Sequence, residues 1–490
     1  MSRKRLFSIL FSAAAALCFS LFFYTFNTPL GPSLGSDNAI YLTMGTALAR
    51  GYTPYTQIFD HKGPLLFLLQ WFPQASSGGY STLSVFIQEV LFLFACLRVL
   101  DAVCRQIKAP GIPLQLADLA LNCAIAGGGN LTEEYTALPT LLGLLLILRL
   151  FDRPLSDLPA DPKKWFRPAV LLGACTACCF LTRANNALPL CAFMAGLSLG
   201  LLFTRRFAAL GVCASGVLCG IAVITVPVVI WLLRRGALGA AFYGAILHNL
   251  RYAETGDTGR LYVLLHTAYG RLALLSLALA SAGALTRLRR APLLSLSMFA
   301  AALAGLYAAF ISRKFYQHYL MIAVPVASCG AAMLLAALPR VSFRRAAALI
   351  LSLLCLAVLG IEGRQADKGR LSARADLPAF TVDAGQLYAK VPEAERSRFM
   401  AYRVEPRWYA VTGALPCMRF YFLQETLAEA NPAVMDEIVD TFNTDPPLWL
   451  VIYYNRTFSP PYDERVAEIF RTRYAFEDAA GEYQLLHLIE

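Results

Sequence analysis

Residues 36–64 read SDNAIYLTMGTALARGYTPYTQIFDHKGP. This stretch follows the first long apolar run of the chain and precedes the next. It therefore places two carboxylates (Asp37 and Asp60), His61 and Lys62 in one loop beside a membrane. Charged groups near hydrocarbon are costly, so they tend to be paired or used. The loop is therefore the first candidate for binding or catalysis.

The composition is that of a polytopic membrane protein. Of the 490 residues, 57% are hydrophobic and 15% are charged, whereas soluble domains carry about 25% charged residues. The net charge of +11 comes from short basic clusters between apolar runs, which is the positive-inside pattern and not a nucleic-acid surface. The 13 cysteines lie nearly all within apolar runs, so no disulfide framework is expected.

About eleven apolar runs are candidates for membrane-spanning helices, given the length that a bilayer requires. They lie near 6–26, 83–104, 113–128, 136–151, 168–183, 187–204, 207–233, 261–286, 291–311, 316–338 and 344–361. Basic clusters follow on alternate sides of successive runs, and all fall on one face if the N-terminus is cytoplasmic. We therefore expect a multi-pass protein of the plasma (inner) membrane whose loop 27–82 and C-terminal region are extracytoplasmic.

Shorter elements are expected outside the spans. Residues 38–50 have helical spacing, with Ser36 or Asp37 as the N-cap, and fit a helix lying along the membrane surface. The apolar segment from Pro64 to Phe72 is too short to cross. From about residue 365 the sequence becomes charged, which predicts a domain boundary between 1–364 and 365–490. The second part is expected to be a small α/β or α+β domain, with strands at 398–411 and 449–454, a helix at 433–442 and a hairpin at 474–488.

The loop also resembles a known family. Asp37 at the start of a short helix, Gly-Tyr-x-Pro-Tyr at 51–55 and Phe-Asp-x-Lys-x-Pro at 59–64 resemble the first outer loop of the GT-C membrane glycosyltransferases. The likeness is to the bacterial branch related to protein mannosyltransferases and aminoarabinose transferases. It implies a GT-C-like bundle that passes a sugar from a polyprenyl-phosphate carrier to an acceptor on the outer face, with Asp37 as the catalytic residue. Beyond residues 36–64 the resemblance is one of layout. Gly63 stands where many relatives carry proline, which loosens that turn.

The chemistry of glycosyl transfer agrees with these residue types. The incoming hydroxyl needs a carboxylate to accept its proton, and Asp37 is the expected general base, although an N-cap role is not exclusive of it. The departing phosphate needs cationic groups, and Lys62 is the leading one. Asp60 either orients the acceptor or holds Lys62. His61 either binds phosphate or metal, or is a structural hydrogen-bond donor.

Other polar clusters fall at later outer turns. Glu133 and Glu134 follow three glycines, and either begin a helix capped by Thr132 or complete an acidic, metal-holding site that is similar to a second acidic motif of the superfamily. Candidate donor-phosphate and substrate residues at further turns are Arg183, His248, Arg313 and His318. The cluster 313–319 also resembles the family, although an interfacial aromatic–basic belt explains it equally. The sequence leaves open whether Mg²⁺ or Mn²⁺ binds, because no full set of hard oxygen ligands can be read from it.

Two other classes remain open. A transporter or flippase would place ionisable groups within spans, where Asp118 and Glu89 are the main candidates. An envelope-polymer assembly protein would share the layout without needing the Asp37 loop. The absence of a nucleotide-binding fingerprint favours a lipid-linked donor. The expected partners are a polyprenyl-phosphate sugar, a lipid, glycan or protein acceptor, and membrane lipids.

Overall fold

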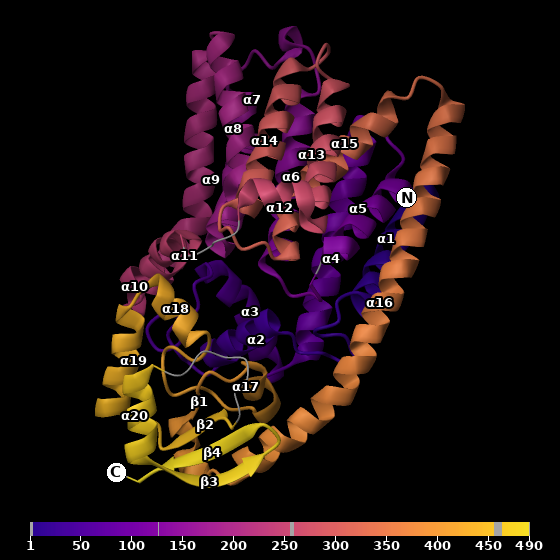
Figure 1. The fold of residues 1–490 in the computed structure, drawn as a ribbon. Coiled ribbons are helices and arrows are strands. Elements are labelled where there is room, and N and C mark those ends of the chain that lie inside the picture. The colour runs from indigo at the N-terminus through magenta and orange to yellow at the C-terminus, as the bar shows by residue number, and fades with distance from the viewer. Residues whose placement is uncertain (1–2, 126, 255–258, 455–462, 490) are drawn as a thin grey trace. The chain divides into compact units, whose positions relative to one another are not determined.

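The computed structural model describes residues 3–125, 127–254, 259–454 and 463–489 (Figure 1). These residues form two compact units, each assembled from separate stretches of the chain. The first unit comprises Met1–Tyr24, Ile87–Trp231 and Gly256–Asp367, and the second comprises Thr25–Phe86, Leu232–Thr255 and Lys368–Glu490. The loop 36–64 thus belongs to the same unit as the C-terminal residues. The expected domain division after residue 364 stays a prediction.

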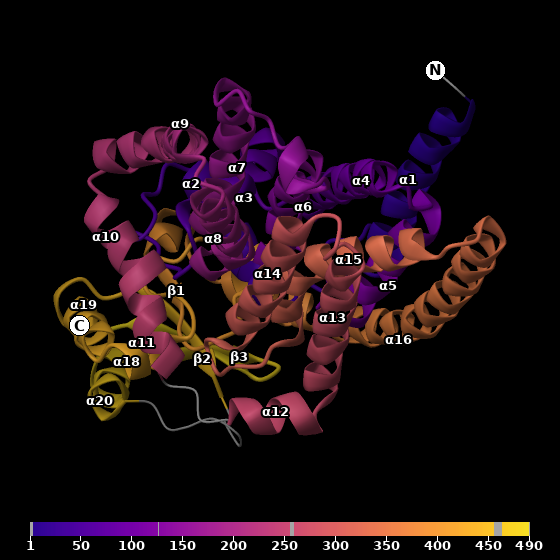
Figure 2. The same ribbon diagram turned by 90° about the horizontal axis from the view of Figure 1, so that it is seen from above.

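Long apolar helices build the first unit. They are α1 (Arg3–Phe22), α4 (Thr82–Ile107), α5 (Gly111–Ile125), α6 (Thr132–Phe151), α7 (Lys163–Thr182), α8 (Leu188–Phe203), α9 (Phe207–Arg234), α12 (Arg260–His266), α13 (Ala268–Leu285), α14 (Pro292–Phe310), α15 (Val324–Ala337) and α16 (Val341–Ala389), with short 3-10 turns at Leu155–Asp157, Ala184–Ala187 and Gln317–Ala323. Helices α4, α9 and α16 continue into the second unit. Helix α14 packs on α8, and α13 packs on both α14 and α15 (Figure 2).

Small residues allow some of these helices to pack backbone against backbone. A Cβ at Gly283 of α13 would lie 2.3 Å from the carbonyl oxygen of Gly330 of α15. A Cβ at Gly330 would lie equally close, 2.3 Å, to the carbonyl oxygen of Leu279. Such close approach through glycine is characteristic of helix pairs in membranes, where hydrophobic burial does not drive association.

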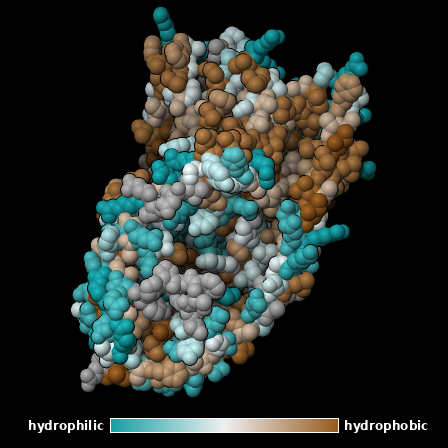
Figure 3. Space-filling model, viewed as in Figure 1, coloured by the Kyte–Doolittle hydropathy of each residue, from teal (hydrophilic) through white to brown (hydrophobic). Residues whose placement is uncertain are grey.

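Ten helices in the described part of the chain are long and apolar enough to span a bilayer. The expected eleventh, near 113–128, is the shorter apolar helix α5. Large apolar side chains such as Phe203 and Leu218 are exposed on this unit, and brown hydrophobic residues dominate its helical surface in Figure 3. Lipid is the solvent that such a surface suits. The chain is therefore a multi-pass membrane protein with an all-α transmembrane part.

Two of the expected spans are interrupted. The run 261–286 is two helices, α12 and α13, which separate at Thr267, whose side chain caps α13 by accepting from the Gly270 amide. The run 316–338 begins as a 3-10 turn, Gln317–Ala323, before α15. Helix α16 continues unbroken to Ala389. The change to charged sequence near residue 365 therefore falls inside one helix and does not end it.

The second unit combines interfacial helices with a small mixed sheet. Its helices are α2 (Ser36–Ala49), α3 (Pro64–Ser77), α10 (Leu238–Phe242), a π-helix at Tyr243–His248, α11 (Asn249–Glu254), a 3-10 turn at Glu393–Arg398, α17 (Arg407–Thr412), α18 (Gln424–Ala430), α19 (Ala433–Thr444) and α20 (Glu464–Arg473). Helix α2 packs on α3 and on α17. The short helix expected near 38–50 is confirmed, and the apolar segment that begins at Pro64 is also a short helix, α3.

The sheet has four strands in the order β1-β2-β4-β3. They are β1 (Phe399–Ala401), β2 (Trp449–Tyr453), β3 (Tyr474–Ala480) and β4 (Tyr483–Leu488). Strand β1 is parallel to β2, whereas β2–β4 and β3–β4 are antiparallel. The hairpin, the strand at 449–454 and the helix at 433–442 are confirmed. The expected strand 398–411 is wrong beyond Ala401, because the chain turns at Pro406 into helix α17.

Candidate functional site

Helix α2 presents Asp37 in its first turn, where the dipole of a helix favours negative charge. The N-cap is Gly35, with no side-chain capping bond, so the expectation that Ser36 or Asp37 caps the helix is wrong. A Cβ at Gly35 would lie 2.2 Å from the ring of Phe26. The chain therefore needs glycine there, and the helix begins one residue earlier than the capping pattern suggested. Asp37 is half-buried at the open end of the helix.

Asp60, His61 and Lys62 form a compact charged cluster within the second unit. Asp60 is fully buried, and its Oδ1 accepts a hydrogen bond of 2.7 Å from the His61 amide. The Lys62 Nζ lies 3.8 Å from the same oxygen and 2.9 Å from His61 Nε2. Only 12% of the Lys62 side chain is exposed. The carboxylate and the ammonium group thus form a buried ion pair.

Backbone contacts fix the position of this cluster. The Tyr55 hydroxyl donates to the carbonyl of Lys62 at 2.7 Å. The Arg419 Nε donates to the carbonyl of Tyr55 at 2.6 Å, and the Phe59 amide donates to the carbonyl of Arg419 at 2.9 Å. These bonds join the loop to a segment about 360 residues downstream. The sequence contains no spacing signal for such a long-range contact, so Arg419 was not assigned to the site.

Tyr421 links the cluster to helix α2. Its hydroxyl donates to the carbonyl of Ile40 at 3.2 Å. Burial, together with the nearby Asp60 carboxylate, raises the pKa of Tyr421 well above its usual range, and the same two causes raise the pKa of Tyr55. Both phenols therefore stay protonated and act as hydrogen-bond donors beside a buried carboxylate.

His248 lies against the same loop. It ends the π-helix Tyr243–His248, is fully buried, and its ring centre is 5.7 Å from that of His61. The ring of Tyr252 lies 5.4 Å from His61, and the Asn249 side chain donates to the carbonyl of His61 at 2.6 Å. π-helical turns occur frequently at functional sites. The structure thus brings His248 beside the Asp60–Lys62 cluster, whereas the sequence placed it only in a separate loop.

The first unit contains a second polar cluster at the start of α6. Glu133 accepts from Arg183 at 2.6 Å and from the Thr132 hydroxyl at 2.7 Å. The guanidinium of Arg183 lies 4.1 Å from the centre of the Tyr319 ring. His318 packs edge-on against Tyr319 with ring centres 4.7 Å apart. Three of the predicted residues, Glu133, Arg183 and His318, therefore lie together around Tyr319, which belongs to the cluster 313–319 noted in the sequence.

Two other predicted residues lie elsewhere in this unit. Glu134 is adjacent in sequence to Glu133 but lines a separate cavity with Glu89 and Asp118. Arg313 is exposed, with a left-handed backbone at φ 54°. The expected capping of α6 by Thr132 is wrong, since Leu131 is the N-cap and makes no side-chain bond. Glu133 and Glu134 do occupy the first turn, as expected.

Divalent-metal binding gains no support from the ligand geometry. Across the described ranges, no group of three or more His, Cys, Asp or Glu side chains has the arrangement of a metal site. What the two clusters do provide is a buried carboxylate–lysine pair, an anion-favouring helix start and a guanidinium paired with a buried carboxylate. These groups suit proton transfer and the binding of an anionic, oxygen-rich ligand.

Comparisons with known proteins identify the fold. No protein-family model and no curated protein sequence matches the chain. Among solved structures, the chain is similar to ArnT from Cupriavidus metallidurans bound to undecaprenyl phosphate, with a TM-score of 0.60 and 15% identity over 98% of this chain and 97% of that one. It is also similar to the same ArnT in the apo state, with a TM-score of 0.55 and 16% identity over the same shares, 98% and 97%. The all-α membrane bundle with its small C-terminal sheet is therefore an ArnT-like GT-C fold.

Proposed function

We propose that the protein is a membrane glycosyltransferase that moves a sugar from a polyprenyl-phosphate donor to an acceptor at the extracytoplasmic face. The observation that carries this proposal is the likeness to ArnT in complex with undecaprenyl phosphate, which extends over 98% of the chain. The likeness supports the proposal through the fold alone, and the polar clusters of the two units supply suitable chemical groups. The acceptor is a lipid, a glycan or a protein.

In this proposal Asp37 is the general base. Its half-buried carboxylate stands in the first turn of α2, where the acceptor hydroxyl would transfer its proton to it as the new glycosidic bond forms. The carboxylate has to be ionised to accept that proton. This role rests on the resemblance of the loop to GT-C enzymes and on the position of the residue.

Lys62 is proposed to stabilise the departing phosphate. Its ammonium group is held 3.8 Å from the buried Asp60 carboxylate, so Asp60 acts by positioning the lysine. A lysine fixed in this way neutralises negative charge as it develops on the leaving oxygen. His61 and His248 lie beside it, and we propose that they shape the substrate site.

Arg183, Arg313 and His318 of the first unit are proposed to bind the donor phosphate. Arg183 is paired with Glu133 at 2.6 Å, and a guanidinium is a planar, always charged group whose fork of N–H donors matches the geometry of a phosphate. Mg²⁺ or Mn²⁺ remains an option for transfer and is tested by adding EDTA to the reaction. In the proposed orientation the N-terminus is cytoplasmic and the C-terminal residues are extracytoplasmic.

The test is sugar transfer in membranes supplied with a panel of radiolabelled polyprenyl-phosphate sugars. The parent protein is compared with Asp37→Asn and with the control Asp376→Asn, which changes an exposed carboxylate on α16. Transfer by the parent and the control, with a loss of at least about 100-fold in Asp37→Asn, is the expected result. Equal transfer by all three would remove Asp37 from the chemistry. No transfer from any donor would favour a transporter or an envelope-assembly protein.

A further inference from the structure

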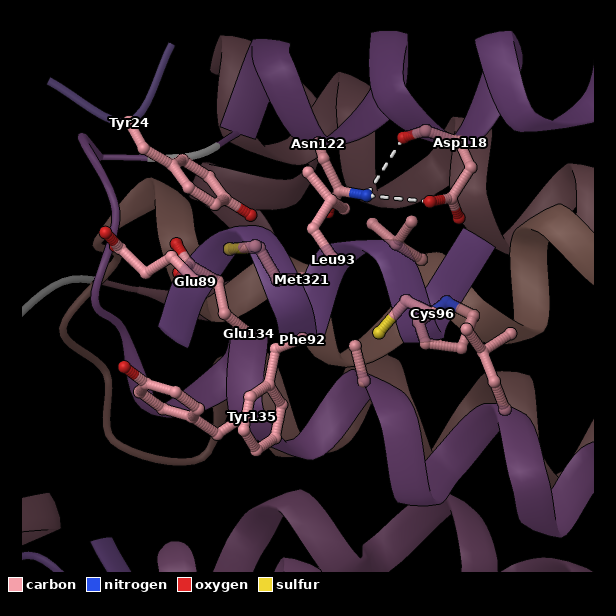
Figure 4. A pocket seen from close by; sticks show the side chains of 14 residues that line it. Tyr24, Glu89, Phe92, Leu93, Cys96, Asp118, Asn122, Glu134, Tyr135 and Met321 are labelled. Carbon is pink, nitrogen blue, oxygen red and sulfur yellow. Dashed lines mark hydrogen bonds between the residues drawn. The ribbon is translucent and has the colours of Figure 1, made fainter. Parts of the chain in front are cut away.

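A cavity of about 30 Å³ lies within the first unit, among α4, α5, α6 and the residues that follow α1. Figure 4 shows Tyr24, Glu89 and Glu134 at one end of it and Asp118 with Asn122 at the other. The remaining wall is apolar except for Tyr135, and Lys, Arg and His are absent from the wall as the structure describes it. Ionised carboxylates in a cavity without a basic side chain, inside a membrane protein, are costly unless a cation or a proton neutralises them.

Glu134 points to a ligand in this cavity. The residue is only 8% exposed, and backbone amides of Leu131 and Asn130 hydrogen-bond to its carboxylate at the start of α6. Its Oε1 atom is buried and has no hydrogen-bond partner among the described residues. A buried carboxylate oxygen without a partner is costly. The side chain is therefore anchored through the helix start and presents one oxygen to the cavity.

Glu89 brings a second carboxylate to the same end. It is 2% exposed and acts electrostatically on Glu134. Its Oε1 would lie 2.5 Å from a Cβ at Gly129, a position with φ 101°. Only glycine suits this backbone and leaves room for the carboxylate. The three-glycine turn noted in the sequence thus accommodates Glu89.

Tyr24 and Asp118, at opposite ends of the cavity, differ in charge and in hydrogen bonding. Burial, followed by the carboxylates of Glu134 and Glu89, raises the pKa of Tyr24 well above its usual range, so its phenol is neutral beside them. Asp118 accepts from Ser328 at 2.7 Å and from Asn122 at 3.1 Å. The Asp118 carboxylate therefore has partners, whereas the Glu134 Oε1 at the other end has none among the described residues.

We propose that Glu89 and Glu134, together with the phenol oxygen of Tyr24, bind one small monovalent cation of the Na⁺ or K⁺ class. Carboxylate and phenol oxygens are hard ligands that such ions accept, and a cation neutralises part of the buried negative charge. The volume admits about two water-sized particles, which is an ion and one water. A tightly held divalent ion is not favoured, because the described residues contain no group of three or more His, Cys, Asp or Glu side chains arranged to ligate one. This inference does not depend on the proposed transferase activity.

The experiment measures thermal unfolding of the purified full-length protein in detergent at fixed pH and ionic strength. NaCl and KCl are each titrated against choline chloride. A ligand that binds the folded state raises Tm saturably, and we expect a rise of about 2 °C in the parent. Glu134→Gln and Glu89→Gln should each abolish this rise, and Gln can replace Glu at the capping position of α6. In choline chloride both variants should unfold no lower than the parent, because each removes one of two repelling charges.

The control is Asp101→Asn, which neutralises a buried carboxylate of α4 that is paired with Arg98 and lies outside the cavity wall. It should retain the rise in Tm with cation whatever its own stability. Binding of ²²Na⁺ with one ion per chain, lost in Glu134→Gln, would be the direct confirmation. Tm that is insensitive to Na⁺ and K⁺, or a rise that persists in both Gln variants, would overturn the proposal. A parent that responds to pH alone would show that the carboxylates share a proton and bind no cation.

Discussion

The ion pair at the start of α6 predicts an asymmetric response to its two single substitutions. Glu133 is fully buried, whereas 12% of the Arg183 side chain is exposed. Arg183→Gln leaves a buried carboxylate that keeps hydrogen bonds from the Thr132 hydroxyl and from its own backbone amide but loses its ion pair. Loss of one partner of a buried pair costs about 3–5 kcal/mol. Glu133→Gln leaves a guanidinium that still lies 4.1 Å from the Tyr319 ring. The loss is then closer to that of one charged hydrogen bond, about 1.5–3 kcal/mol.

The assay is equilibrium unfolding in mixed detergent micelles, applied to the parent, both single variants and the double variant. Because the two side chains are in direct contact, the double variant should be less destabilised than the sum of the singles by roughly 2 kcal/mol. The exposed Arg289→Gln serves as a control for loss of an arginine and should change stability by less than about 0.5 kcal/mol. Additive single effects, or a larger cost for Glu133→Gln than for Arg183→Gln, would refute the reasoning.

Two further predictions concern packing and pH. Gly330→Ala should destabilise by roughly 1–3 kcal/mol, because its methyl group would meet the backbone of α13 at the carbonyl oxygen of Leu279. Gly211 lies in the same unit, and a Cβ added there would contact no described residue within 4 Å outside its own stretch of helix. Gly211→Ala should therefore stabilise the protein by about 0.5–1 kcal/mol, and the Tm values of the two variants test the contrast. The hydrogen bond from Arg465, with the cap of α20, lowers the pKa of Asp463. Its stabilisation is thus fully present above the unfolded pKa, about 3.9, and is lost as pH falls from there through the lower folded pKa. Asp463→Asn should cost about 0.5 kcal/mol or less at pH 7, and this difference in unfolding free energy should shrink steadily as pH is lowered below about 3.9.

The membrane helices were predictable because one physical quantity decides them. A run of apolar residues long enough to cross a bilayer is a local property, and every run from 6–26 to 344–361 corresponds to helix in the structure. Interruptions within a run are not set by hydropathy. The break at Thr267 depends on the hydrogen bond that its side chain accepts from the Gly270 amide. Gly270 has no room for a side chain, because a Cβ there would lie 2.2 Å from the carbonyl oxygen of Leu264 in α12. A contact between two elements decided the outcome there.

The error at 398–411 has a similar origin. Aromatic and β-branched residues in this stretch favour a strand, and the first three residues, Phe399–Ala401, do form one. Arg403 then takes a left-handed backbone at φ 55°, and Pro406 starts α17. The large side chains Trp408 and Tyr409 are fully buried from a helix. Large aromatic side chains in this stretch indicate burial, and either a strand or a helix can bury them. The aromatic composition therefore did not distinguish a strand from a helix.

The limits of sequence reasoning are clearest at Glu133 and Glu134. Both carboxylates were identified as candidates for one acidic site, since they are adjacent and begin the same helix. Successive residues of a helix point about 100° apart, so the two side chains cannot share one partner easily. Glu133 pairs with Arg183, which is 50 residues away in sequence. Glu134 instead lines the cavity that Glu89 also lines. Which carboxylate obtains a basic partner depends on where α4 and α7 pack against α6. The wall around Glu134 contains no basic side chain among the described residues, and this is why we propose that a bound cation neutralises that carboxylate.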